Sequence, residues 1–526
     1  TITDGGKNGH YTEARAYDTQ TYADVMLNIN KTFGDDWSLT ANVGASLNNI
    51  KTDELSYRGP IQENGLPNIF NVFDLDDTKK RAEKVGWHDQ TQSVFASVEV
   101  GWKQMLYLTA TGRNDWASQI AGSPSKSFFY PSVGLSWVPS STWDLGNAFS
   151  YLKLRGSIAS VGLPFPRFLT TPTYEYDATG KIWKDKTHYP IGDLKPERTI
   201  TYEVGIDARL WKNISLSASW YSADTKNQTF DPALPPSSSY TTIYLQTGHV
   251  RNTGVELSLG YSNQWRDFGW SSNFTFSWNK NEIVDLASGA LNPVTGQPLN
   301  LSELDIKGLG KAKYILKQGG TLGDLYTTSD LKFNDNGYVE VDKAGNLLLT
   351  DEGEQIYLGS VFPSENLAWR NDFRYKGINL GLLFTGRIGG ICYSATQANM
   401  DLYGVSEVSA AARDAGGVLI NGREMVDAQK WYQAIGSQSG LPQYYTYSAT
   451  NFRLQELSLG YTLPRKWFRN KMVLTVSFVG RNLWMIYCKA PFDPEAVAST
   501  GLSYQGIDYF MMPSLRSLGF NVKFEF

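Results

Sequence analysis

The sequence is dominated by long stretches in which apolar and polar residues alternate strictly. From Trp37 to Leu47 the odd positions are apolar, while the even positions from Ser38 to Asn48 are polar or small. A period of two places successive side chains on opposite faces of a β-strand. Each such stretch therefore predicts a strand with one apolar face. The same division recurs at residues 93–102, 200–210, 472–481 and 518–526.

About fifteen such segments follow one another, and short and long connections alternate between them. They start near residues 22, 37, 91, 106, 129, 150, 199, 214, 251, 268, 366, 378, 451, 472 and 515. Outer-membrane barrels have short periplasmic turns and long extracellular loops. We therefore predict an all-β fold, a transmembrane antiparallel β-barrel. Its short links are 34–36, 103–105, 211–213, 263–267 and 376–377, and its long loops are 54–90, 116–128, 162–198, 224–250, 281–365, 389–450 and 482–514.

Composition excludes several other classes of protein. The net charge of −4, from 48 basic and 52 acidic side chains, argues against nucleic acid binding. No window approaches the roughly 18 to 20 apolar residues of a membrane-spanning helix. Tryptophans are expected at strand ends, where amphipathic rings form girdles at the two lipid–water boundaries. They are Trp37, Trp102, Trp137, Trp211, Trp220, Trp278, Trp467 and Trp484.

The order of turns and loops also predicts which way the outer strands run. The last segment, 514–526, follows a long loop and so runs inward, and the first, 22–33, precedes a short turn and runs inward too. Bacterial single-chain barrels have an even number of strands. We therefore expect residues 1–21 to lie outside the cell and at least one further strand to precede residue 1. Residues 1–526 would then be the C-terminal part of a larger barrel.

No pattern typical of catalysis or of a metal site is found. The four histidines stand alone, without the spacing of a zinc site, and no nucleophile elbow or phosphate-binding loop occurs. Cys392 and Cys488 are expected to be isolated thiols, with a disulfide as the alternative. We predict no enzyme, no cofactor and no metal.

Eight stretches, in order, resemble the SusC-like TonB-dependent transporters of the outer membrane. The likeness runs from about residue 17 to residue 526. The stretches are TATGRNDW (109–116), LKPERTITYEVGID (194–207), RDAGG (413–417), VDAQKWYQ (426–433), RLQELSLGYTLP (453–464), VGRNLW (479–484), APFDPE (490–495) and GIDYFMMPSLRSLGFNVKFEF (506–526).

The resemblance implies a 22-stranded barrel, plugged by an N-terminal domain, in the outer membrane of a Gram-negative bacterium. The fifteen segments would be the last two-thirds of that wall, with the plug, the first strands and the TonB-contacting region outside this chain. The implied partners are a SusD-like surface lipoprotein, the TonB complex, outer-membrane lipid and a second transporter–lipoprotein pair. Asp335, Asn336 and Gly337 keep only a fragment of the acidic calcium-like loop of some relatives.

The resemblance further implies TonB-coupled import of nutrient oligomers. Oligosaccharide is the first choice of cargo because it dominates the family. The alternatives are an oligopeptide importer of the same family, a passive porin, an outer-membrane structural or secretion scaffold, and a soluble β-rich glycan-binding protein.

Aromatic residues in the long loops are the candidate substrate contacts. Flat rings can stack on sugars or pack against peptide side chains, and loops at a barrel mouth meet a ligand first. Loop packing or contact with the lipoprotein would explain the same residues. The candidates are Trp183, Tyr189, Tyr240, Tyr244, Tyr403 and Trp431, beside Tyr432, Tyr444 and Tyr445.

The final strand carries alternating apolar residues that end in an aromatic, Phe526. Together with Phe520 and Phe524, this terminal aromatic resembles the signal read by the outer-membrane insertion machinery. We expect Phe526→Asp to lower the yield of assembled protein, because an outward charge costs several kcal/mol deep in lipid and less near the rim. Heat-modifiable mobility of outer-membrane extracts measures that yield. A normal folded yield would contradict both hypotheses, that Phe526 is part of an assembly signal and that the final strand faces lipid.

Overall fold

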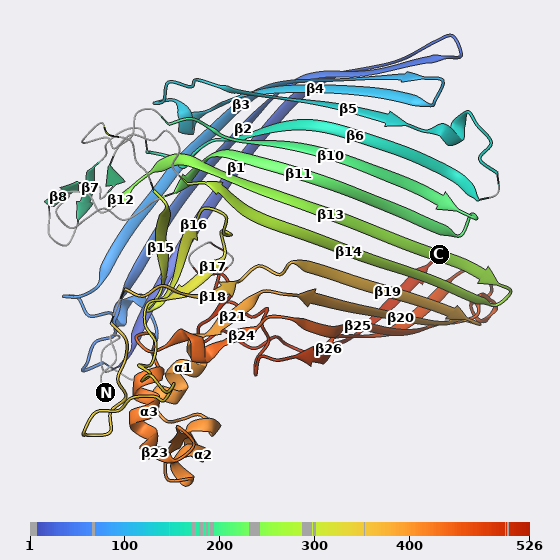
Figure 1. Ribbon diagram of the computed structural model, residues 1–526. Helices are drawn as coiled ribbons and strands as arrows, with labels where there is room; N and C mark the ends of the chain where they lie inside the picture. Colours follow the sequence, from blue (N-terminus) through green and yellow to red (C-terminus); the bar gives the residue numbers. More distant parts are fainter. Residues whose placement is uncertain are drawn as a thin grey trace.

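One antiparallel sheet of fifteen strands forms most of the molecule (Figure 1). The computed structural model describes residues 8–526 except 66–68, 147, 170–173, 178–181, 186–187, 190–193, 231–241, 287–296, 298–300, 352, 500 and 502–503. The strands of this wall are β1 (His10–Phe33), β2 (Trp37–Pro60), β3 (Arg81–Trp102), β4 (Leu106–Ala117), β5 (Phe128–Trp137), β6 (Phe149–Leu163), β10 (Glu197–Leu210), β11 (Ile214–Phe230), β13 (Leu245–Trp265), β14 (Phe268–Asp285), β19 (Glu365–Tyr375), β20 (Ile378–Ile388), β25 (Asn451–Thr462), β26 (Val473–Cys488) and β28 (Ser517–Glu525).

The predicted order of strands, turns and loops is confirmed. The strands pair strictly in chain order, each antiparallel to the next. Tight turns lie at one end of the sheet and long loops at the other (Figure 1). At the turn between β19 and β20, Lys376 and Gly377 both have positive φ, 46° and 90°. This backbone matches the right-handed twist of the strands that it joins.

Several strands begin earlier than the alternation predicts. β1 starts at His10 rather than near residue 22, β3 at Arg81 rather than 91, and β13 at Leu245 rather than 251. The β1–β2 ladder continues unbroken to His10 opposite Pro60. Beyond the membrane both faces of a strand meet water, so the hydrogen-bonded ladder persists while the alternation of side chains is lost.

The two faces of the wall differ in the way a lipid-facing barrel requires. Apolar side chains such as Val43, Val94, Leu108 and Val204 share the outward face and are exposed. Polar side chains occupy the alternate, inward positions.

The tryptophan expectation is right for the turn end of the sheet and wrong for the loop end. Trp37 and Trp102 pair across β2 and β3, with ring centroids 6.3 Å apart. Trp220, Trp278 and Trp484 lie inside strands rather than at their ends. These strands continue past the lipid boundary, so the boundary falls within them.

Short elements occupy the loop end. They are β7 (Tyr174–Asp177), β8 (Ile182–Asp185), β9 (His188–Tyr189), β12 (Thr242–Ile243), β15 (Glu303–Leu309), β16 (Ala312–Lys317), β17 (Asp324–Thr327), β18 (Ile356–Ser360), β21 (Ile391–Ser394), α1 (Ala395–Leu402), α2 (Glu407–Asp414), β22 (Val418–Ile420), β23 (Glu424–Val426), α3 (Ala428–Ile435), β24 (Thr446–Ser448) and β27 (Ile507–Asp508), with 3-10 turns at 72–74, 118–120, 139–141, 442–445 and 465–468. In the described part of the chain, none of the helices is long and apolar enough to cross a membrane.

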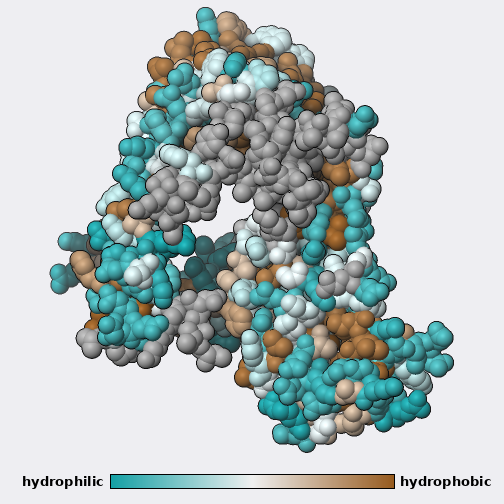
Figure 2. Space-filling view, turned by 90° about the vertical axis from the view of Figure 1, so that its left-hand side faces the viewer, coloured by the Kyte–Doolittle hydropathy of each residue, from teal (hydrophilic) through white to brown (hydrophobic). Residues whose placement is uncertain are grey.

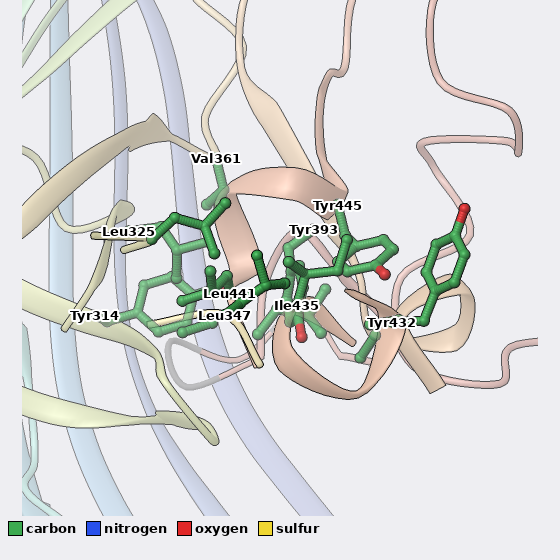
Figure 3. Close-up of a cluster of buried hydrophobic side chains, with 14 residues drawn as sticks. Tyr314, Leu325, Leu347, Val361, Tyr393, Tyr432, Ile435, Leu441 and Tyr445 are labelled. Atoms are coloured by element: carbon green, nitrogen blue, oxygen red, sulfur yellow. The ribbon is translucent and has the colours of Figure 1, made fainter. Parts of the chain in front are cut away.

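Residues 303–360 and 391–450 fold together into a compact unit, here called the loop module. Side chains at α1, α2 and α3 cap the helices: Ser394, Ser406 and Asp427 each accept a hydrogen bond from a first-turn N–H. One apolar core joins the strands and the helices (Figure 3). That core draws on three successive loops, since it includes Tyr314, Tyr393 and, from the loop after β26, Ile507.

The two faces should differ in how far they tolerate a positive charge at the depth of the membrane. On β11, Ala218 pairs with Ile206 and Leu257 on the outward face, while the next residue, Ser219, faces inward. We expect Ala218→Arg to lower the free energy of unfolding by about 2–4 kcal/mol, and the matched Ser219→Arg by much less. Denaturant titration of the protein folded in lipid vesicles measures both. Equal losses would contradict the assignment of the faces.

Candidate functional site

The loop end of the molecule is hydrophilic and hollowed, with an opening visible between its side chains (Figure 2). Below it, the inward face of β6, β11, β13, β14 and β19 surrounds a hollow of about 360 Å³. Hydroxyl and amide groups dominate the inward positions in its lining. The lining residues include Arg155, Ser217, Ser219, Glu256, Ser258, Thr275, Ser277 and Asn366.

Charged side chains cross-link the inward face beside this hollow. Arg155 of β6 contacts Glu203 and also lies 3.6 Å from Asp207, both on β10. Ser217 of β11 donates a hydrogen bond of 2.7 Å to the same Asp207. The guanidinium is therefore held against the wall, with its charge balanced by the neighbouring carboxylates.

A second ladder of charges runs along the inward face of β19, β25 and β26. Arg370 donates to Asp372 at 2.9 and 3.0 Å and lies 3.6 Å from Glu456. Arg481 donates to Glu456 at 3.0 Å. Both signs of charge thus line the lumen close to one another.

A buried ion pair attaches the last long loop to the wall. Arg453 of β25 is 5% exposed and donates two hydrogen bonds, of 3.1 and 2.9 Å, to Asp493. Glu495 lies 3.2 Å from the same guanidinium, and Ser514 contacts Asp493 from the far end of the loop. Paired geometry of this kind offsets the cost of burying the charges. Beside it lies a hollow of about 180 Å³ that is lined in part by Arg387 and Asn451.

The structure does not bring the predicted loop aromatics into one site. Trp183 on β8 and Tyr403 at the end of α1 are 69% and 76% exposed. Tyr244 is half-buried, Tyr189 ends β9, and Tyr240 lies outside the described residues.

Trp431 and its neighbours belong to the loop module. Trp431 of α3 packs against the module core, and its ring meets that of Tyr444 edge-on at 6.2 Å. Tyr432 and Tyr445 are buried members of the core itself (Figure 3). Burial raises the pKa of Tyr444 to about 12, with the charge of Asp330 adding to the effect. These rings pack within the loop module, as the alternative explanation of the loop aromatics expected.

Cys392 and Cys488 are free thiols, as the first interpretation expected. Cys392 is fully buried on β21, and burial raises its pKa to about 12. The calcium-like fragment forms an exposed turn in which the Asn334 side chain accepts hydrogen bonds from the N–H groups of Asn336 and Tyr338. Across the described ranges, no three histidine, cysteine or acidic side chains group as metal ligands would.

Strand β28 forms one edge of the wall. Phe520 pairs with Phe478 of β26, and their rings lie 5.8 Å apart. Phe524 pairs with Leu474, and Phe526 follows the end of the strand with 94% of its surface exposed.

Sequence reasoning missed the charged inward face and the loop anchor. The inward charges were visible in principle, because Glu203, Asp207 and Arg209 sit on the polar parity of an alternating segment. Which of them meet depends on strand register, which loop lengths do not reveal. The Arg453–Asp493 pair joins two of the quoted motifs, RLQEL and APFDPE, which only the fold places together.

Comparison with known proteins gives consistent matches. The family described as TonB dependent receptor-like, beta-barrel matches residues 2–362. TonB-dependent receptor P3 of Formosa agariphila is 24% identical over 565 residues, covering 99% of this chain and 54% of that protein. TonB-dependent receptor SusC of Bacteroides thetaiotaomicron is 20% identical over 343 residues, covering 63% of this chain and 32% of that protein.

The fold is also similar to solved structures. The RagAB peptide importer in its closed-closed state superposes with a TM-score of 0.72 at 19% identity, over 98% of this chain and 56% of that chain. Its open-open state gives 0.70 at 18% identity, over 98% and 55%. This chain spans about half the length of P3 and of the superposed chains.

The loop anchor predicts an acid-labile contact. Although burial opposes it, hydrogen bonds from Arg453, Ser514 and the Glu495 N–H hold the pKa of Asp493 below its usual 3.8. A carboxyl group whose pKa is lower in the folded state stabilises the fold at any pH above its unfolded-state pKa. That stabilisation is lost as the pH falls through the folded-state pKa. We expect loop 489–516 to become protease-sensitive in that acid range, and in Asp493→Asn already at neutral pH. Limited proteolysis against pH checks this; an equally protected loop in the variant would contradict it.

Proposed function

The chain belongs to the TonB-dependent receptor β-barrel family, whose barrels lie in the outer membrane of Gram-negative bacteria, and on that premise we propose that it forms part of a transporter for nutrient oligomers. The observation that carries the proposal is the polar inward face, which borders an open hollow of about 360 Å³. A wall that is apolar outside and polar inside suits passage of a hydrophilic cargo.

Oligosaccharide is our first choice of cargo. Six of the inward side chains around the hollow, Ser217, Ser219, Ser258, Thr275, Ser277 and Asn366, offer hydroxyl or amide groups. Such groups both donate and accept hydrogen bonds, as sugar hydroxyls require. Trp183 and Tyr403 add exposed rings at the loop end for stacking on sugar faces.

Oligopeptide is the second candidate, favoured by a different observation. The inward ladder of Arg370, Glu456 and Arg481 presents both signs of charge within a few ångströms. A peptide carries an ammonium, a carboxylate and charged side chains, which such a wall could bind through charge-assisted hydrogen bonds.

Import against a gradient needs energy, and the outer membrane has no nucleotide supply. We propose that TonB supplies it by acting on a plug domain, because an unfilled barrel of this width would leave an open channel. A SusD-like surface lipoprotein would capture cargo above the loops, in a dimer of transporter–lipoprotein pairs. The exposed apolar side chains of the loop module, Tyr403, Val405, Val408, Leu419 and Met425, support contact with a protein on that side.

We propose that other strands complete the wall. Strands β1 and β28 form the two edges of the sheet and run in the same direction. A lipid-exposed sheet edge leaves backbone N–H and C=O groups without partners. An odd number of additional strands between these edges would restore antiparallel pairing throughout.

A growth experiment tests the proposal. We expect deletion of the gene, or of TonB, to abolish growth on one class of oligomer, glycan or peptide, while growth on its monomer continues. Uptake of labelled oligomers by the same strains separates transport from metabolism. A passive porin would make uptake independent of TonB, and a scaffold would leave uptake unchanged in the deletion strain; either result would overturn the proposal.

A further inference from the structure

The first three strands of the wall extend far beyond their neighbours at the loop end. β3 pairs with β4 only as far as Thr91 opposite Ala117, whereas its ladder with β2 continues through residues 81–90. At the usual rise of a strand, this adds roughly 30 Å of β3 beyond its pairing with β4. Residues 10–21, 49–60 and 81–90 are here called the β-arm. The β-arm projects past the ends of β4, β5 and β6 (Figure 1).

The β-arm is a sheet without an apolar core beneath it. The three apolar clusters at the loop end take their buried residues from Ala117 onward in the chain. The side chains of residues 14–21 and 81–86 are all exposed. The ladders of the β-arm hold it together, with ion pairs such as Arg58–Glu83 at 3.1 Å. A small sheet with no packed face is weakly held as a unit, so its position depends on contacts with the rest of the rim.

Two neighbouring contacts fix the β-arm to the rest of the rim. The Gln90 N–H donates a hydrogen bond of 3.0 Å to the Ser118 hydroxyl, at the level where pairing with β4 ends. Beside it, a guanidinium nitrogen of Arg167, from the loop after β6, lies 2.9 Å from a carboxylate oxygen of Asp89. The same guanidinium lies 4.6 Å from the centre of the Trp87 ring, within the range of a cation–π contact. Arg167 thus contacts the β-arm in two ways at once.

The loop that carries Arg167 is well anchored. Phe165, two residues earlier, is 3% exposed and belongs to the apolar cluster that includes Ile120. Phe168, the next residue, has a φ of 64°, a left-handed conformation that is rare for a bulky side chain. The chain therefore turns sharply where it presents the guanidinium. Arg167 is the fixed side of its contact with the β-arm.

The contact lies on the inner side of the β-arm. Trp87 and Asp89 occupy inward positions of β3, in unbroken register with Thr52 and Ile50 of β2. They are half-buried, whereas residues 81–86 are exposed. Because β4 and β5 end below this level, Arg167 reaches the β-arm from a strand that is not its neighbour in the sheet. The contact therefore bridges an interruption in the rim.

We propose that the β-arm is a movable flap of the mouth and that Arg167 is the latch that holds it closed. The hinge would cross the row of paired residues Thr21, Asn49 and Gln90, where the support of β4 ends. The side chains of Arg167 and Asp89 are 35% and 16% exposed, and an ion pair in contact with water is weak enough to open reversibly. Opening would part the β-arm from residues 164–169 and widen the mouth above β4 and β5. This motion goes beyond the proposed function and holds for any cargo.

Distances between spin labels in the protein reconstituted into lipid vesicles test the proposal. One label is placed at Lys84→Cys on the β-arm and one at Lys126→Cys in the loop after β4, both exposed positions, with Cys392 and Cys488 replaced by alanine. Pulsed electron paramagnetic resonance should give one narrow distance for the closed β-arm. We expect Arg167→Gln to raise the ratio of open to closed arms about tenfold, because the ion pair and the ring contact are lost together.

Matched variants separate a latch from a general loosening of the sheet. Arg58→Gln removes an arginine–carboxylate pair that lies wholly within the β-arm, and should leave the distance unchanged. Arg167→Asp should open the β-arm, and the exchanged pair Arg167→Asp/Asp89→Arg should close it again. Heat-modifiable mobility confirms that each variant is folded. The wild-type distance in Arg167→Gln would overturn the proposal, as would equal opening in Arg58→Gln or a failure of the exchanged pair to restore the narrow distance.

Discussion

Backbone hydrogen bonding in a medium without water is the constraint on which the wall depends. Every N–H and C=O group within the hydrocarbon needs a partner in the protein. The fifteen strands meet this need between neighbours, with ladders in chain order from β1 through to β28, and only the outer edges of β1 and β28 are left to pair elsewhere. Once the ladders are set, the pleat divides each strand into a lipid face and a water face, and the other properties of the wall follow from that division.

The wall was largely predictable because lipid and water impose opposite demands on alternate residues. The stretch from Trp37 to Leu47 shows its two faces residue by residue, so the strand was recognised and its start at the turn end, Trp37, was predicted correctly. The same logic fails for residues 10–20, where water lies on both sides of the strand. The side chains there do not alternate, although the hydrogen-bonded ladder continues.

The loop module and the candidate site were beyond sequence reasoning for a different physical reason. Tyr314, Tyr393 and Ile507 share one core but come from three loops separated by membrane strands. Their contacts depend on the fold, and no local pattern in the sequence predicts them. The Arg453–Asp493 pair is similar: two charged residues in separate motifs become one buried unit only when the last loop folds back on β25. The loop aromatics therefore could not be sorted by burial from the sequence: Tyr445 is buried in the core, whereas Tyr403 is exposed.

The shared core of the loop module has a mechanical consequence. Because side chains from the loops after β14, β20 and β26 pack into one another, these three hairpin ends are fastened together above the membrane. That sector of the rim is rigid, because strands β14 to β28 cannot move apart at the loop end without disrupting a folded core. Among the described residues, the loops that follow β1 to β10 contribute neither to this core nor to the neighbouring one of Phe230, Val250, Ile283, Leu286, Leu304 and Leu316, so outward movement of the wall is easier at those strands.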